Sequence, residues 1–144
     1  MRKGLLLLLV TMSVLVYSCS RGGSPVDDGN GNPHVENPSD TTPPVITIST
    51  PTESQTFTSG NTIQMTGRIS DDLGLYKGTV KLVNDANGLV LKEQAYEIHG
   101  LLAYNFSLAH TAVVSAASNY TVTVSFEDHG LNTVTRSVKI KVNP

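Results

Sequence analysis

The stretch Tyr120-Thr121-Val122-Thr123-Val124-Ser125-Phe126 decides the fold, because large apolar side chains alternate in it with hydroxyl-bearing side chains. Successive side chains of a β-strand point to opposite faces of a sheet. The alternation therefore predicts a strand with one face in a core and one face in water. The stretch is typical of an all-β domain.

Six other runs between Val45 and Pro144 resemble the first in having short apolar rows bounded by turn residues. They cover residues 45–49, 62–70, 76–82, 89–98, 102–108 and 134–142. The run 89–98 has apolar residues at both odd and even positions, which predicts an edge strand. Asn87-Gly88 before it is a hairpin signal. About seven short strands predict an all-β, immunoglobulin-like two-sheet sandwich. A small closed barrel is the alternative, since periodicity does not distinguish the two.

The N-terminus has the pattern of an export signal. Arg2 and Lys3 precede an apolar stretch of 14 residues from Gly4 to Tyr17. A membrane-spanning helix needs about 20 apolar residues, so this shorter stretch predicts a cleaved signal peptide over residues 1–18.

The residues after the signal, Val16-Tyr17-Ser18-Cys19, resemble a lipobox. The resemblance implies that Cys19 receives a lipid, becomes the first residue of the mature chain and anchors it to a membrane. An ordinary signal peptide with an incidental cysteine is the alternative. By analogy with the enteric sorting rule, Ser20 favours the outer membrane. The periplasmic and cell-surface leaflets both stay open.

Residues 19–44 are expected to be the lipidated cysteine and a disordered tether. From Ser20 to Pro44 the chain has four glycines, five prolines and only two aliphatic side chains, Val26 and Val35. Such a segment cannot bury enough apolar surface to offset its ordering entropy. The folded domain is therefore expected over residues 45–144, held away from the lipid surface by the tether.

Charge and cysteine content exclude some classes of function. Residues 45–144 carry 7 basic and 8 acidic side chains, so nothing favours binding to a nucleic acid. Cys19 is the only cysteine, so an intrachain disulfide is impossible. A core of about 100 residues suffices without one.

The layout of the domain resembles bacterial immunoglobulin-like domains on envelope lipoproteins, and it is similar to a domain-of-unknown-function family of Gram-negative lipoproteins. The stretches that carry the resemblance are Pro44-Val45-Ile46-Thr47-Ile48, Ser70-Asp71-Asp72-Leu73-Gly74-Leu75, Ile98-His99-Gly100 and Tyr120 to Asn132. These motifs mark strand ends and turns, so the resemblance implies a fold and no catalytic residue.

A near-repeat, Asp72-Leu73-Gly74-Leu75 and Asp128-His129-Gly130-Leu131, follows two of the predicted inward strands. In an immunoglobulin-like topology the two turns lie at the same end of the sandwich. Carboxylate and amide oxygens there would suit calcium, which takes about six to eight oxygen ligands. The hypothetical ligands are Asp71, Asp72, Glu127, Asp128 and Asn132, with Asp40 as a further candidate. The alternative is that each Asp caps its own turn and each Gly supplies a positive φ.

The histidines His99, His110 and His129 are scattered and lack metal-site spacing, so isolated loop or edge positions are expected for them. No nucleophile-elbow or phosphate-loop motif is present either. We therefore expect no enzyme activity and no cofactor other than the hypothetical calcium ion.

The sequence favours a lipid-anchored, non-catalytic envelope module that binds a protein or glycan partner. Its recognition loops are expected at 71–75, 84–88 and 127–132. The alternative is a structural subunit of an envelope assembly that uses the irregular edge at residues 89–98. An envelope hydrolase is the third hypothesis, without a motif to support it.

Overall fold

A computed structural model describes residues 26–27 and 33–144. The predicted signal peptide, Cys19 and most of the predicted tether lie outside the described residues. Within the described part of the chain, no helix is long and apolar enough to cross a membrane. Val26–Asp27 (β1) and Pro33–His34 (β2) form a two-residue antiparallel pair, and all other strands belong to one sandwich.

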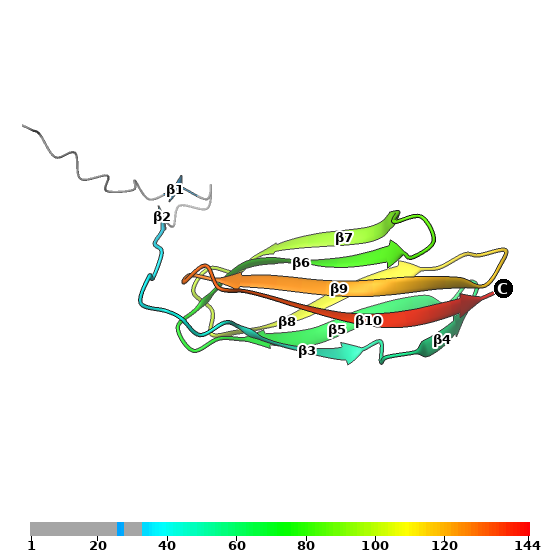
Figure 1. Ribbon diagram of the computed structural model, residues 1–144, viewed down its shortest axis with the longest axis horizontal. Coiled ribbons are helices and arrows are strands. Elements are labelled where there is room, and N and C mark those ends of the chain that lie inside the picture. Colours follow the sequence, from blue (N-terminus) through cyan, green and yellow to red (C-terminus); the bar gives the residue numbers. More distant parts are fainter. Residues whose placement is uncertain (1–25, 28–32) are drawn as a thin grey trace, which may run out of the picture.

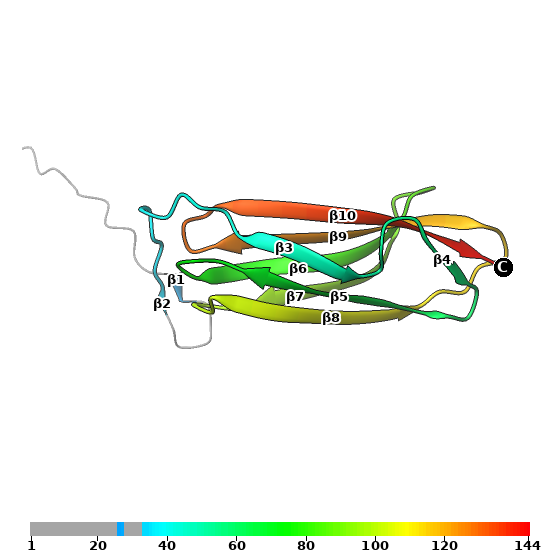
Figure 2. The ribbon, with the colours of Figure 1, turned by 90° about the horizontal axis from the view of Figure 1, so that it is seen from below.

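The sandwich consists of a five-stranded and a three-stranded sheet packed face to face (Figures 1 and 2). The five-stranded sheet has the order β4 (Gln55–Thr58), β10 (Thr133–Asn143), β9 (Ser118–Asp128), β6 (Leu75–Asn84) and β7 (Val90–Glu97). The three-stranded sheet has the order β3 (Val45–Thr50), β5 (Thr62–Ser70) and β8 (Ala103–Thr111). All neighbours are antiparallel except β4 and β10, which are parallel.

The immunoglobulin-like sandwich predicted from the sequence is confirmed, and the closed barrel is not, because no hydrogen-bonded ladder joins the two sheets among the described residues. Each of the seven predicted runs is a strand. The strand at 89–98 is an edge as predicted, since β7 pairs only with β6. β4 was not predicted from the sequence, because four residues with a single half-buried aromatic, Phe57, are too short to show a period.

The core lies between the sheets and is formed by the rows predicted to face inward. Val122, Val124 and Phe126 of the deciding stretch are fully or almost fully buried. Each fully buried side chain of this size contributes about 1.5–3 kcal/mol relative to an exposed one. The three-stranded sheet contributes Ile46, Ile63, Met65, Ile69, Phe106 and Leu108.

Each sheet places one phenylalanine ring where a neighbouring strand carries a glycine. Phe106 of β8 pairs with Gly67 of β5, and Phe126 of β9 pairs with Gly78 of β6. A Cβ atom on either glycine would overlap the ring opposite to it. The two glycines therefore make room for the two largest fully buried side chains.

One predicted inward residue is displaced by a β-bulge. The register between β6 and β9 shifts between Leu75 and Lys77, so that Leu75 is fully buried while Tyr76 is half-buried. A bulge adds one residue to a strand and redirects its side chains. Tyr76 consequently lies at the end of the sandwich instead of in the core row.

The last part of the predicted tether differs from the expectation of disorder. Asp40 is only 3% exposed, and the backbone amide of Asn37 donates a 2.8 Å hydrogen bond to the carbonyl of His129. These contacts are made by polar groups. A prediction from composition takes polar residues as a sign of disorder, so it does not foresee such contacts. The ordered unit therefore begins before Val45, and residues 35–44 cover one end of the sandwich.

The Phe126–Gly78 contact predicts the effect of a small substitution. Gly78→Ala should lower the free energy of unfolding by about 1–3 kcal/mol, because an added methyl group overpacks the core. Urea denaturation followed by far-UV circular dichroism measures it. Lys81→Ala on the same strand is the control, since it loses only an exposed ion pair with Glu93. Equal costs for the two variants would contradict this packing.

Candidate functional site at the tether end

Four segments meet at the end of the sandwich where the chain enters it (Figures 1 and 2). We call this the tether end, and it consists of residues 35–44, 71–74, 98–102 and 129–132. The near-repeat was expected to bring its two turns to the same end of the sandwich, and this is confirmed. Both turns belong to the tether end.

Backbone hydrogen bonds join these segments to one another. The amide of His129 donates to the carbonyl of Gly74 at 3.1 Å, and the amide of Leu75 donates to the carbonyl of Leu101 at 2.9 Å. The amide of Asn37 in turn donates to His129. The loops thus form one connected surface, in which each segment restricts its neighbours.

Asp128 caps its own turn. It is fully buried, and its Oδ1 accepts the backbone amide of Asn132 at 2.8 Å while its Oδ2 accepts the side-chain amide of Asn132 at 3.0 Å. Hydrogen bonds to both oxygens compensate the burial of the carboxylate. The capping alternative therefore describes Asp128 and Asn132, two of the hypothetical calcium ligands.

Asp71 also caps its turn, but with one oxygen only. Its Oδ2 accepts the amides of Leu73 at 2.9 Å and Gly74 at 2.8 Å. Gly74 has a φ of 136°, so this turn uses its glycine as the capping alternative expected. The Oδ1 of Asp71 is left over and is buried.

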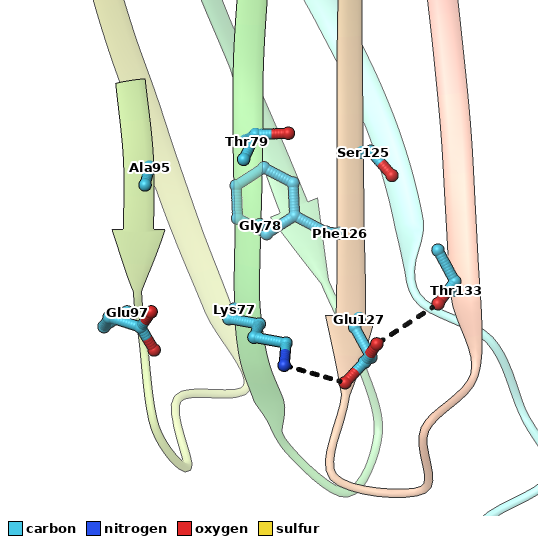
Figure 3. A pocket seen from close by; sticks show the side chains of 9 residues that line it. All are labelled: Lys77, Gly78, Thr79, Ala95, Glu97, Ser125, Phe126, Glu127 and Thr133. Carbon is cyan, nitrogen blue, oxygen red and sulfur yellow. Dashed lines mark hydrogen bonds and ion pairs between the residues drawn. The ribbon is translucent and has the colours of Figure 1, made fainter. Parts of the chain in front are cut away.

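Glu127 lies on a different face from the other hypothetical ligands. Its carboxylate is 3.7 Å from the ammonium group of Lys77 and accepts a long hydrogen bond from the Thr133 hydroxyl (Figure 3). These groups border a pocket of about 250 Å³ on the outer surface of the five-stranded sheet. The structure therefore does not bring Glu127 to Asp71 and Asp72.

The described residues contain one acidic cluster with metal-ligand spacing, formed by Asp40, Asp71 and Asp72. One carboxylate oxygen from each residue lies within 4.8 Å of the other two. Asp40 is buried, Asp71 is half-buried and Asp72 is exposed. Of the five residues hypothesised as calcium ligands, only Asp71 and Asp72 belong to this cluster. Asp40, the further candidate, is the third member of the cluster.

Gly130 allows Asp40 to approach the β9–β10 loop. A Cβ atom on Gly130 would be 2.6 Å from the carbonyl oxygen of Asp40 and 2.7 Å from its Cβ. The side-chain amide of Asn132 donates to the same carbonyl at 3.1 Å. The glycine therefore serves a close approach, and the positive φ of this turn falls on Leu131, at 65°. This second turn departs from the capping alternative in that respect.

Two of the histidines, expected to be isolated, lie together. The rings of His99 and His129 have centroids 5.6 Å apart, and each also packs against Tyr76. Nδ1 of His129 is 3.1 Å from the carbonyl oxygen of Val35. This cluster has no signal in the sequence, because it depends on the bulge that displaces Tyr76.

Two side chains outside the tether end have shifted pKa values. Burial, with a smaller contribution from Lys92, lowers the pKa of His110. Burial, followed by the neighbouring Tyr104, raises the pKa of Tyr96. Tyr96 belongs to β7 and His110 to β8, which are edge strands of the two different sheets, and neither residue belongs to the tether end.

No protein-family model matches this sequence, and no curated protein matches it. Among solved structures, the chain is similar to fibronectin(III)-like modules of Clostridium thermocellum CbhA, with a TM-score of 0.45, 13% identity, and coverage of 68% of this chain and 94% of that one. The chain is also similar to murine CRIg, with a TM-score of 0.45, 16% identity, and coverage of 71% of this chain and 98% of that one. A third similar structure is the sporulation control protein Spo0M of Bacillus subtilis, with a TM-score of 0.45, 10% identity, and coverage of 71% of this chain and 49% of that one. Likenesses at this level say nothing about function, and the sheet topology above identifies the fold.

The contact between Gly130 and Asp40 yields a prediction. Gly130→Ala should displace residues 35–42 from the tether end, because the added methyl group occupies the space of the Asp40 backbone. Hydrogen exchange should then become at least tenfold faster at the amides of Asn37 and Asp40, with little change in β9 and β6. Gly60→Ala is the control for a strained glycine substitution without a steric overlap, because its φ of 91° disfavours alanine while its Cβ would contact nothing within 4 Å. It should leave both amides protected. Unchanged protection of both amides in Gly130→Ala would refute the contact.

Proposed function

We propose that this chain is a lipid-anchored envelope module that binds a protein partner through its tether end and catalyses no reaction. The observation that carries the proposal is a group of exposed apolar side chains on three adjoining loops. Leu73, Leu101, Leu102 and Leu131 are each about half exposed, between 49% and 57%. Exposed apolar side chains that gather on one surface mark sites of interaction.

Leu131 supplies an independent argument. Its φ of 65° lies in the left-handed region, which favours Gly and Asn and disfavours a bulky side chain. An exposed leucine at such a position costs about 1–2 kcal/mol and packs against little in return. Strain of this kind is typical of functional positions. A binding role for the leucine side chain would explain why it is there.

The position of the tether end suggests where the partner resides. Fifteen residues separate Cys19 from Val35, the first exposed residue of the tether end. A chain of that length spans at most about 50 Å when fully extended, and the pairing of β1 with β2 shortens this span. We call the surface formed by Leu73, Leu101, Leu102 and Leu131 the leucine surface. If Cys19 carries the lipid, the leucine surface lies at the end of the sandwich that is tethered to the membrane. A protein embedded in or attached to the outer membrane is therefore the proposed partner.

The loops expected to recognise a partner do not form one surface. The loops at 71–75 and 127–132 contribute Leu73 and Leu131 to the tether end, whereas Asn84–Gly88 connects β6 to β7 at the opposite end. The proposal therefore uses the first two loops, adds Leu101 and Leu102, and leaves the β6–β7 turn out.

The two alternatives use other surfaces. A glycan would find hydroxyl and charged groups in the outer-face pocket, which is lined in part by Lys77, Ser125 and Glu127 (Figure 3). A structural subunit would add a strand to β7, but charged side chains such as Glu93 on that edge oppose strand addition. The leucine surface includes neither the outer-face pocket nor the β7 edge. Its apolar side chains favour a protein partner.

Leu131→Asn tests the proposal, because it should separate stability from binding. Relief of the left-handed strain should raise the free energy of unfolding by about 1 kcal/mol. Loss of the apolar side chain should reduce recovery of the partner when the tagged lipoprotein is captured from crosslinked cells of its own source. Quantitative mass spectrometry of the captured proteins provides the measurement.

Val113→Asn is the matched control, since Val113 is a highly exposed apolar residue in the β8–β9 connection at the opposite end. It should leave the partner's recovery unchanged. Equal recovery with Leu131→Asn and wild type would show that the tether end is not the interface. If the wild-type chain captures no protein, a glycan-binding screen becomes the next test.

A further inference from the structure

We propose that Asp40, Asp71 and Asp72 bind a calcium ion that fastens residues 35–44 to the sandwich. Asp40 belongs to the segment before β3, while Asp71 and Asp72 begin the β5–β6 loop. One oxygen from each carboxylate lies within 4.8 Å of the others. Asp40 and Asp71, with 30 residues between them in the sequence, thus present their carboxylates together with that of Asp72 to a common point.

Two carboxylate oxygens in this cluster have no hydrogen-bond partner. Oδ2 of Asp40 and Oδ1 of Asp71 are buried, and no donor reaches either of them within the described part of the chain. The second oxygen of each residue is occupied, by the amide of Thr42 for Asp40 and by two loop amides for Asp71. Asp40 and Asp71 are therefore each held in place by one carboxylate oxygen and keep the other oxygen unpaired.

A buried carboxylate oxygen without a partner is unfavourable, and like charges at this spacing add their repulsion. Asp40 is 97% buried, so water does not compensate its charge. Among the described residues, the ion pairs of lysine involve Glu93 and Glu127 and none of these three aspartates. A bound cation would supply the missing partner for all three carboxylates at once.

The ligands favour calcium over other metals. All three are oxygens, and neither a histidine nor a cysteine belongs to the cluster, which disfavours zinc. Calcium binds oxygens at about 2.3–2.6 Å, so two ligands of one ion can be as far apart as about 5 Å. Magnesium requires shorter bonds and near-ideal octahedral geometry, which three carboxylates on separate segments satisfy less easily.

The surroundings leave room for the rest of the coordination shell. Asp72 is exposed, and a surface pocket of about 280 Å³ borders it together with Asp71 and Thr42. Water can therefore complete the six to eight ligands that calcium takes. The ion would join the entering chain to the β5–β6 loop, and so fix the direction in which the tether leaves the sandwich.

This inference is independent of the proposed partner and of lipidation, because it uses only contacts inside the domain. The full-length chain in detergent micelles, freed of metal by a chelator, is titrated with calcium by calorimetry and melted with and without calcium. We expect one site with a Kd of about 0.1–1 mM, as in extracellular modules, and a higher melting temperature with calcium.

Two variants and a control make the test specific. Asp72→Asn should weaken calcium binding at least tenfold without changing the melting temperature of the calcium-free chain, because Asp72 is exposed. Asp40→Asn should abolish the calcium response, yet leave the calcium-free chain at least as stable, because it removes a buried unpaired charge. Asp85→Asn, at the opposite end of the sandwich, should bind like wild type.

Three outcomes would overturn the proposal: no heat and no change in melting temperature for the wild-type chain, calcium affinity in Asp72→Asn equal to that of wild type, or magnesium binding as tight as calcium binding. The first rejects the site, the second rejects its ligands, and the third rejects the choice of metal.

Discussion

The close packing of a phenylalanine ring over a glycine, once in each sheet, is the constraint on which the rest of the structure depends. Phe106 and Phe126 are almost fully buried, and Gly67 and Gly78 leave the space that their rings occupy. Interiors are packed as densely as organic crystals, so a side chain on either glycine would force the strands apart. The two contacts therefore fix how the inner face of each sheet is packed.

The tether end follows from this arrangement. Because β5, β7 and β9 all finish at the same end, the loops that follow them come within hydrogen-bond reach. Asp128 then fixes its turn through Asn132, and Gly130 permits Asp40 to pack on that turn. The burial of an acidic residue from outside the predicted domain is thus a consequence of how three loops meet. It places a buried carboxylate beside those of Asp71 and Asp72, where a cation would balance the negative charge.

The alternation of residues predicted the strands and the sandwich well, because burial on one face of a sheet repeats along the chain. Which acidic side chains lie together was predicted less well, for a physical reason that applies to strands in general. Glu127 and Asp128 are adjacent in β9, so their side chains point to opposite faces and cannot bind the same ion from within the strand. Asp71 and Asp72 lie in a loop, which allows both to reach one point. The bulge at Tyr76 and the packing of Asp40 depend on contacts between distant segments, which no local pattern reports.

The central claim is that the chain before β3 is held to the sandwich by an ion between Asp40, Asp71 and Asp72. A high-resolution crystal structure of the chain grown with calcium tests it most directly. The account predicts an anomalous scattering peak bound by one oxygen from each aspartate at about 2.3–2.6 Å, with residues 35–42 packed on the β9–β10 loop. A structure in which these three carboxylates bind only water, or in which calcium lies at Glu127 or Asp128 instead, would contradict it.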